Sequence, residues 1–198
     1  MPPQLAALAK TLIYKNVSLL GRKTQYNTVC LGDSMAAGWP FYLSLRLRAP
    51  VELMSYGGKT SDYIRAQFEN QRVDPSTILI SWTGNNNYDD PSQVLADISA
   101  LVGGRPRFLV LGLVNADIED SRQGQAGYDH IVDCNRRLAD AYGERFIDTR
   151  AELIARGSTE HDLPPACFRW DDIHLNGRGQ RLVAGLVYRR MRSLGWTT

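Results

Sequence analysis

Short apolar runs alternate with longer amphipathic stretches along most of this chain, and this alternation constrains the fold more than any other feature. The apolar runs cover residues 28–31, 51–54, 77–82, 108–114 and 145–148. Helical patterns lie between and after them, at 39–47, 61–70, 91–101, 131–142, 151–155 and 177–194. Strands separated by helix-length segments form right-handed βαβ units, in which the strands are parallel and helices cover both faces. The sequence therefore predicts an α/β fold with a central parallel sheet of about five strands.

The length of 198 residues fits one domain, because domains usually span about 100–200 residues. Hydrophobic residues make up 43% and charged residues 22%, which is an ordinary globular balance that argues against disorder. We expect a single domain over residues 1–198. Residues 1–26 precede the first strand and carry an amphipathic pattern, so we expect them to form a helical extension that docks on the domain or, alternatively, lies on a membrane surface.

Charge and cysteine content narrow the classes of partner and compartment. The formal net charge of +2 gives no indication of nucleic-acid binding. Three scattered cysteines are too few for a disulfide framework and fit a reducing compartment. No signal peptide and no run of 18 apolar residues is evident, so we expect a cytoplasmic protein without a transmembrane segment. The sequence gives no indication of oligomeric state.

Polar clusters rich in glycine follow three of the expected strands. They are Gly32-Asp33-Ser34, Gly57-Gly58-Lys59-Thr60 and Gly84-Asn85-Asn86-Asn87. Ligands bind at the carboxyl ends of parallel strands, so we expect these clusters to meet at one edge of the sheet. A fourth cluster, Asp171-Asp172-Ile173-His174, comes just before the last helical pattern.

Ser34, His174 and Asp171 are candidates for nucleophilic catalysis. A serine between a strand and a helix exposes its hydroxyl, and the nearby helix N-terminus favours developing negative charge, although the same position suits a helix N-cap. The three-residue spacing lets Asp171 reach Nδ1 of His174, which leaves Nε2 free to accept the serine proton. Asp172 is the rival carboxylate, less favoured by its spacing. His130 and His161 show no metal-ligand spacing, so no metal site is expected.

Gly58 and Asn86 are candidate oxyanion donors, together with the backbone N–H of Ser34. The N–H of a glycine approaches a ligand closely because no Cβ intervenes, and an asparagine amide is a neutral donor. Each of these residues, taken alone, also suits an ordinary turn.

The order and spacing of these clusters resemble the SGNH (GDSL) hydrolases over about residues 27–194. Residues 32–38, Gly-Asp-Ser-Met-Ala-Ala-Gly, resemble the first block of that family, and Gly58 matches the glycine of the second block. Gly84-Asn85-Asn86 resembles the third block, and Asp171 to His174 resembles the Asp-x-x-His block. The resemblance implies a flavodoxin-like three-layer α/β/α sandwich. It also implies a serine hydrolase that needs neither metal nor cofactor.

The resemblance implies a role for each matching residue. Ser34 would be the nucleophile, His174 the base and Asp171 the residue that orients it. Gly58 and Asn86, with the Ser34 N–H, would form the oxyanion hole.

Three positions depart from the pattern of the family. Met35 replaces the usual leucine, Asn87 stands where aspartate is common, and Asp172 stands where glycine is frequent. None of these changes removes a catalytic group. The Gly-x-Ser-x-Gly elbow of the α/β-hydrolases is absent, which argues against that fold.

Two long loops, residues 115–127 and 158–172, are the main material for substrate binding. The first is polar, and neither has the pattern of an amphipathic lid helix, whereas an acyl tunnel needs a continuous apolar lining. We therefore expect a small-molecule or carbohydrate ester with a short acyl group, such as an acetylated sugar. Residues expected to contact substrate are Asp33, Lys59, Asn87, Phe168 and Trp170. An acyltransferase, a lipase or lysophospholipase, and a non-catalytic binding domain remain alternatives.

Overall fold

The computed structural model describes residues 21–157 and 161–198. The helix expected within residues 1–26 therefore lies mostly outside the described residues, and residues 21–27 form no helix. Lys23 connects this segment to the domain, because its N–H donates to the carbonyl of Leu47 and its carbonyl accepts from Thr198. Within the described residues, no helix is both long and apolar enough to span a bilayer.

Five parallel strands form the central sheet, as the alternation of patterns predicts. They are β1 (Thr28–Gly32), β2 (Glu52–Ser55), β3 (Ile78–Trp82), β4 (Phe108–Leu111) and β5 (Phe146–Ile147). The spatial order is β2-β1-β3-β4-β5, which is the flavodoxin-like order. In this order the chain reverses its direction of winding after β2, so the loops after β1 and β3 lie side by side.

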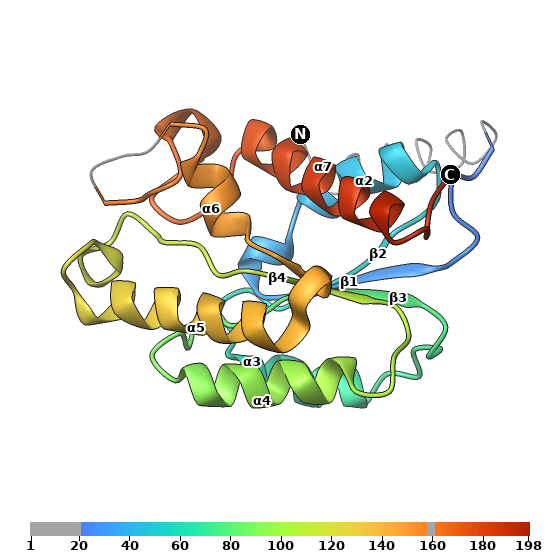
Figure 1. The fold of residues 1–198 in the computed structure, drawn as a ribbon, viewed down its shortest axis with the longest axis horizontal. Helices are drawn as coiled ribbons and strands as arrows, with labels where there is room; N and C mark the ends of the chain where they lie inside the picture. The colour runs from blue at the N-terminus through green and yellow to red at the C-terminus, as the bar shows by residue number, and fades with distance from the viewer. Residues whose placement is uncertain (1–20, 158–160) are drawn as a thin grey trace, which may run out of the picture.

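Helices cover both faces of the sheet and complete a three-layer sandwich (Figure 1). On one face lie α2 (Trp39–Leu47), α6 (Thr149–Ile154) and α7 (Gly177–Ser193). On the other face lie α3 (Ser61–Glu69), α4 (Pro91–Val102) and α5 (Ala126–Tyr142). Four short 3-10 helices, η1 (Ser34–Ala36), η2 (Glu119–Ser121), η3 (Gly143–Arg145) and η4 (Ala166–Phe168), lie in the connecting segments.

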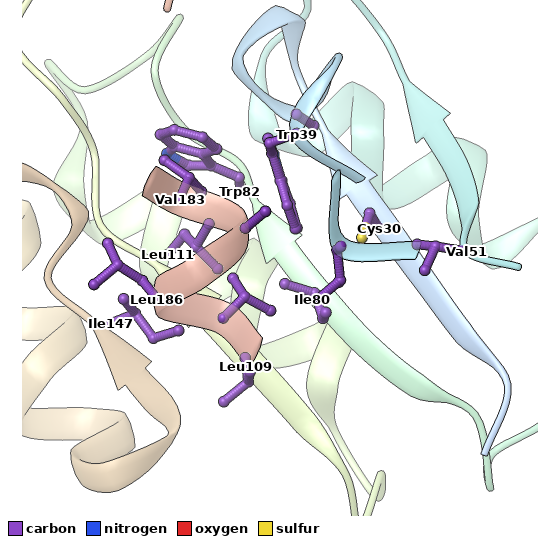
Figure 2. Close-up of a cluster of buried hydrophobic side chains, with 14 of the residues drawn as sticks. Cys30, Trp39, Val51, Ile80, Trp82, Leu109, Leu111, Ile147, Val183 and Leu186 are labelled. Atoms are coloured by element: carbon purple, nitrogen blue, oxygen red, sulfur yellow. The ribbon is translucent and has the colours of Figure 1, made fainter. Parts of the chain in front are cut away.

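Alternating side chains of the strands form one apolar core on each face of the sheet. Cys30, Ile80 and Leu109 point to the face that carries α7 and belong to one cluster with its Val183 and Leu186 (Figure 2). Val29, Leu79 and Val110 point to the opposite face and pack against α3, α4 and α5. Burial of these side chains holds the strand ends, and the loops that follow them, in fixed positions.

Trp82 is a core residue rather than a surface for substrate. It is completely buried, its ring centroid lies 6.4 Å from that of Trp39, and its Nε1–H donates to the carbonyl of Gly112 at 2.9 Å. The sequence indicates this role, since Trp82 belongs to the apolar run of β3.

Element boundaries differ from the sequence expectations at β4 and α5. The apolar run continues to residue 114, but β4 ends at Leu111, because Leu113 binds the side chain of Asn135 through both its N–H (2.7 Å) and its carbonyl (2.9 Å). The helical pattern predicts a start at residue 131, but α5 begins five residues earlier at Ala126, and the positive φ of +90° at Gly124 makes the turn before the helix.

Two short elements near residue 148 also have shifted boundaries. The expected strand over 145–148 is reduced to two residues, and the helix expected at 151–155 begins at Thr149. The cause is Asp148, whose side chain accepts a hydrogen bond from Ala151 N–H and so caps α6.

Candidate active site

Ser34 lies two residues after the end of β1, at the carboxyl edge of the sheet. A side chain at Gly32 would overlap the carbonyl oxygen of Trp82, so only glycine lets β1 approach β3 closely at this point. Asp33 then caps the short helix η1 by accepting a hydrogen bond from Met35 N–H at 2.9 Å. This turn presents the hydroxyl of Ser34, the first residue of η1, at the surface of a pocket.

His174 connects Ser34 to Asp171. Its Nε2 lies 3.0 Å from the Oγ of Ser34, and its Nδ1 lies 2.9 Å and 3.1 Å from the two carboxylate oxygens of Asp171. These distances are those of hydrogen bonds, and they fit an imidazole whose Nδ1–H points to the carboxylate and whose Nε2 faces the hydroxyl. The structure thus brings Ser34 into contact with a histidine that lies 140 positions away in sequence.

The carboxylate of Asp171 is held by its own loop. The backbone N–H groups of Ile173 and His174 donate to Oδ1 at 2.8 Å and 2.6 Å. These bonds, with the side-chain bond to His174, lower the pKa of Asp171 to about 2. Asp172, the rival carboxylate, instead uses its backbone carbonyl to accept from the N–H of Asp117.

The loop that carries Asp171 and His174 is closed like a hairpin. Arg169 and Leu175 form an antiparallel bridge, and Trp170 N–H donates to the carbonyl of His174 at 2.8 Å. Asn176 fixes this loop to α7: its amide NH₂ donates to the carbonyls of Cys167 and Arg169, and its oxygen caps the first turn of the helix.

Gly58 lies in a tight turn beside Ser34. Lys59 N–H donates to the carbonyl of Tyr56 at 3.2 Å, and the φ of +70° at Gly58 suits the third position of such a turn. A Cβ at Gly57 would lie 3.8 Å from the Cβ of Ser34, so the turn packs directly on the serine. Within the described part of the chain, the N–H of Gly58 donates to no protein acceptor and is available to a ligand.

Asn86 lies on the neighbouring loop, after β3. Its amide NH₂ donates one hydrogen bond to the carbonyl of Lys59 at 3.0 Å, and an NH₂ group carries two hydrogens. One hydrogen therefore remains for a ligand. Asn86 and Ser34 line the same pocket, so this free donor belongs to the same site as the serine hydroxyl.

Asp33 stands behind the site rather than in it, which corrects the expectation that it contacts substrate. Its side chain is completely buried, and its Oδ2 accepts from the backbone and side-chain N–H groups of Asn85 at 3.1 Å and 3.0 Å. Burial raises the pKa of Asp33, and the bonds from Asn85 and Met35 oppose this shift. The sequence analysis did not assign a role to Asn85. A buried carboxylate requires hydrogen-bond donors, so the position of Asp33 directly after β1 is the signal that could have identified Asn85.

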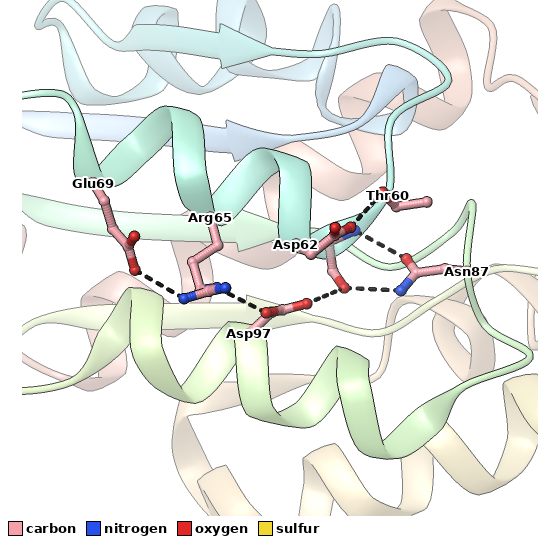
Figure 3. A network of polar contacts seen from close by, with 7 residues as sticks. Thr60, Asp62, Arg65, Glu69, Asn87 and Asp97 are labelled. Carbon is pink, nitrogen blue, oxygen red and sulfur yellow. Dashed lines mark hydrogen bonds and ion pairs between the residues drawn. The ribbon is translucent and has the colours of Figure 1, made fainter.

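Asn87 is likewise a structural link, not a pocket residue. Its Oδ1 accepts from Ser61 N–H at 3.0 Å, and its Nδ2 donates to Ser61 Oγ at 2.9 Å. Ser61 Oγ donates in turn to the buried carboxylate of Asp97, which also binds Arg65 (Figure 3). This network attaches the loop that carries Asn86 to the N-terminus of α3.

The other three residues expected to contact substrate have different surroundings. Lys59 is exposed, with its Nζ 5.1 Å from the ring centroid of Tyr63. Phe168 is half-buried against the core and lines neither pocket at Ser34. Trp170 is 82% exposed and lines the pocket in front of His174.

Two pockets meet at Ser34. The larger, of about 500 Å³, extends past His174 between the start of α2 and the start of α7, and it includes Tyr42 and Gln180. The smaller, of about 230 Å³, extends past Asn86 toward Ile118 and Ile173. The sequence did not single out these four lining residues, because nothing local distinguishes them from ordinary surface residues.

The groups around Ser34 are a hydroxyl, an imidazole, a carboxylate and the free amide hydrogen of Asn86, with the free N–H of Gly58 in the adjoining turn. A set of groups of this kind can carry out acyl transfer. Among the described residues, no three His, Cys, Asp or Glu side chains are grouped so as to hold a metal ion. His130 and His161 therefore belong to no such group.

Comparison with solved structures gives the fold class. The chain has the three-layer fold of a G-D-S-L-like lipase from Bacteroides thetaiotaomicron, with a TM-score of 0.70 and 14% identity over 93% of this chain and 98% of that one. A member of the lipolytic G-D-S-L family from Veillonella parvula gives a TM-score of 0.66 and 17% identity, covering 83% of this chain and 97% of that one.

An acetylxylan esterase from Geobacillus stearothermophilus, solved as a catalytic mutant, gives a TM-score of 0.65 and 13% identity over 85% of this chain and 95% of that one. The fold is therefore that of the SGNH (GDSL) hydrolases, as the four sequence blocks predict. No protein-family model and no curated protein matches the sequence.

Proposed function

We propose that this chain is a metal-independent serine ester hydrolase of the SGNH (GDSL) type. The observation that carries the proposal is the continuous hydrogen-bonded path from Ser34 Oγ through His174 to Asp171, with contacts of 3.0 Å and 2.9 Å. Its location at the carboxyl edge of the sheet, in a fold shared with lipolytic proteins and esterases, supports the assignment.

The residues have distinct roles in the proposed reaction. Ser34 Oγ attacks the ester carbonyl carbon while its proton moves to Nε2 of His174, and Asp171 stabilises the resulting imidazolium. The carbonyl oxygen, now negative, accepts hydrogen bonds from the N–H groups of Ser34 and Gly58 and from the Asn86 amide. His174 then gives its proton to the oxygen of the leaving alcohol as the carbon–oxygen bond breaks.

Hydrolysis of the acyl-enzyme completes the cycle. His174 accepts a proton from a water molecule, whose oxygen attacks the acyl carbon, and the same donors stabilise the second oxyanion. His174 returns the proton to Ser34 Oγ as the carboxylic acid leaves. An acyltransferase would replace the water with a hydroxyl of an acceptor molecule, so product analysis with and without added sugar distinguishes the two activities.

We propose short-chain esters of a carbohydrate-like alcohol, O-acetyl esters among them, as the substrate class. The exposed indole of Trp170 and the side chains of Asn176 and Gln180 line the larger pocket, and such an aromatic surface with polar neighbours suits a sugar ring. Acetylxylan esterases among the proteins of the same fold support this substrate class.

Labelling with a fluorophosphonate probe tests the proposed nucleophile. The wild-type chain should be labelled and should hydrolyse p-nitrophenyl acetate, whereas Ser34→Ala should do neither. Ser193→Ala is a matched control, because Ser193 is exposed at the end of α7 and bonds only the local carbonyl of Arg190. Labelling that persists in Ser34→Ala would contradict the assignment.

Esterase activity should also survive exhaustive chelation with EDTA. Loss of activity with EDTA, followed by recovery on adding Zn²⁺, would overturn the metal-independent mechanism.

A further inference from the structure

The two pockets at Ser34 share that residue and Met35 but no other lining residue. The larger pocket is formed by α2, the loop 170–176 and the first turns of α7. The smaller pocket is formed by the loop after β3, residues of the segment 114–121, and Ile173. An ester has two sides, acyl and alcohol, and this arrangement offers a separate space for each.

Proton transfer determines which pocket holds the alcohol side of the ester. The leaving alcohol oxygen must take its proton from His174 Nε2, so it must lie within hydrogen-bond reach of that atom. His174 lines the larger pocket and not the smaller one. The alcohol therefore occupies the larger pocket.

The hydrogen-bond donor to the carbonyl oxygen indicates the same orientation of the ester. Asn86 lines the smaller pocket only. With the carbonyl oxygen at Asn86 and the alcohol oxygen at His174, the remaining substituent of the ester carbon, which is the acyl chain, points away from His174. Resting on the hydrolysis proposed above, we infer that the smaller pocket holds the acyl chain and that Ile118 and Ile173 determine how long that chain can be.

The lining of the smaller pocket fits this occupant. Its walls include the aliphatic side chains of Val114, Ala116, Ile118 and Ile173, together with Met35. Ile118 is 39% exposed and Ile173 is 45% exposed, so both leave apolar surface in contact with water at this pocket. A hydrocarbon chain that covers them would remove this apolar surface from water.

The size of the pocket sets the class of acyl group. A volume of about 230 Å³ corresponds to roughly eight groups the size of water, at about 30 Å³ each. Ile118 and Ile173 are partly exposed, so part of this volume is open to solvent and lies outside the acyl contact. The substrate is thus a straight aliphatic ester whose acyl chain has up to about six carbons. Each methylene that enters the pocket should raise kcat/KM by about twofold to fourfold.

A series of p-nitrophenyl esters from C2 to C12 tests the assignment in the full-length chain. For the wild type, kcat/KM should rise from C2 to a maximum at C4–C6 and fall at C8. Ile118→Trp should lower kcat/KM for C4–C6 by about tenfold or more relative to C2, because the larger side chain fills the pocket. Ile118→Ala and Ile173→Ala should move the maximum to longer chains. Val132→Ala, which shortens an aliphatic residue with the same 39% exposure on α5, should leave the profile unchanged.

Variants of the larger pocket provide the opposite test. Trp170→Ala should leave the acyl-length profile unchanged and instead alter the preference among alcohols, measured with acetyl esters of xylose, of glycerol and of p-nitrophenol. A wild type that is neither labelled at Ser34 nor active on any ester would overturn the proposed function itself. A wild type that is active and labelled, but whose acyl-length profile responds to Trp170→Ala and not to Ile118→Trp, would overturn only the pocket assignment.

Discussion

Asn87 and Asp97 lie on opposite sides of one hydroxyl group, that of Ser61. The hydroxyl donates its single hydrogen to Asp97 at 2.6 Å and accepts a hydrogen from the Asn87 amide at 2.9 Å. The direction of these bonds requires an amide at position 87, because a carboxylate has no hydrogen to donate. Asn87, which stands where the SGNH hydrolases commonly have aspartate, is thus matched to a buried aspartate on α4.

Asn87→Asp should therefore destabilise the fold, even though aspartate is common at the matching position of the SGNH hydrolases. Two carboxylates would compete for one hydroxyl hydrogen, and we expect a loss of about 1–3 kcal/mol in the free energy of unfolding. Asp97→Asn in the same chain should recover part of the loss, because the amide introduced on α4 can then donate to Ser61. Urea unfolding of both single variants and the double variant measures this coupling. Strictly additive losses would show that the two residues do not communicate through Ser61.

Asn86→Ala should lower kcat by about 10²–10³-fold with little change in KM. In the proposed reaction the side chain supplies a hydrogen bond that strengthens as the carbonyl oxygen becomes negative, so its loss acts on the transition state. Steady-state kinetics on p-nitrophenyl acetate measures both parameters. Asn70→Ala is the control, because Asn70 is an exposed asparagine that bonds only to the last turn of α3. An increase in KM with kcat preserved would make Asn86 a substrate-binding residue instead.

Asp171→Asn should reduce activity far more than Asp172→Asn. Only Asp171 lies against Nδ1 of His174, and an amide there can present its NH₂ to the ring and favour the wrong tautomer. We expect a loss of about 10²–10⁴-fold in kcat for Asp171→Asn and less than about fivefold for Asp172→Asn. Equal losses would reverse the assignment of the carboxylate.

The acid stability of the fold should show the low pKa of Asp171. Its pKa of about 2 lies below the ordinary value of 3.8, so its hydrogen bonds contribute stability that is complete above about pH 4 and disappears as the pH falls toward 2. The side chain is 49% exposed, so the contribution is small. The difference in Tm between the wild type and Asp171→Asn should persist at about pH 4.5 and shrink below pH 4. A difference that vanishes by pH 5.5 would contradict this pKa.

One cysteine should react rapidly with Ellman's reagent in the native chain, and three after denaturation. Cys30 and Cys134 are buried, and burial raises the pKa of the Cys134 thiol to about 12 and that of Cys30 well above its ordinary range. Only Cys167 is exposed. Cys167→Ser should abolish the fast reaction; rapid reaction of a second thiol would mean that one core opens readily.

The sequence predicts the parts of this site that depend on local chemistry. Polar clusters after β1 and β3 meet because the carboxyl ends of parallel strands share one edge of the sheet. The Asp171–His174 contact depends on a spacing of three residues within one loop, which is also local. Both could be predicted before the structure was known.

Features that depend on contacts between distant segments could not be predicted in this way. The end of β4 at Leu111 depends on the side chain of Asn135, which lies on α5. The role of Asn85 depends on the burial of Asp33, and the apolar pocket depends on bringing Ile118 close to Ile173. A polar stretch of sequence around Ile118 gives no indication that its single isoleucine faces a pocket.

Asn176 both binds the hairpin that carries His174 and caps α7, and this link affects the timescale on which the site can open. Asn176, together with Gln180, attaches the hairpin that carries His174 to α7, and α7 buries Val183 and Val187 in the core of the sheet. The hairpin and the helix should therefore belong to one cooperative unit of unfolding. In hydrogen exchange, the amides of Trp170 and Gly179 should lose protection together with the core of α7, so that His174 keeps its position relative to Ser34 until the domain as a whole unfolds.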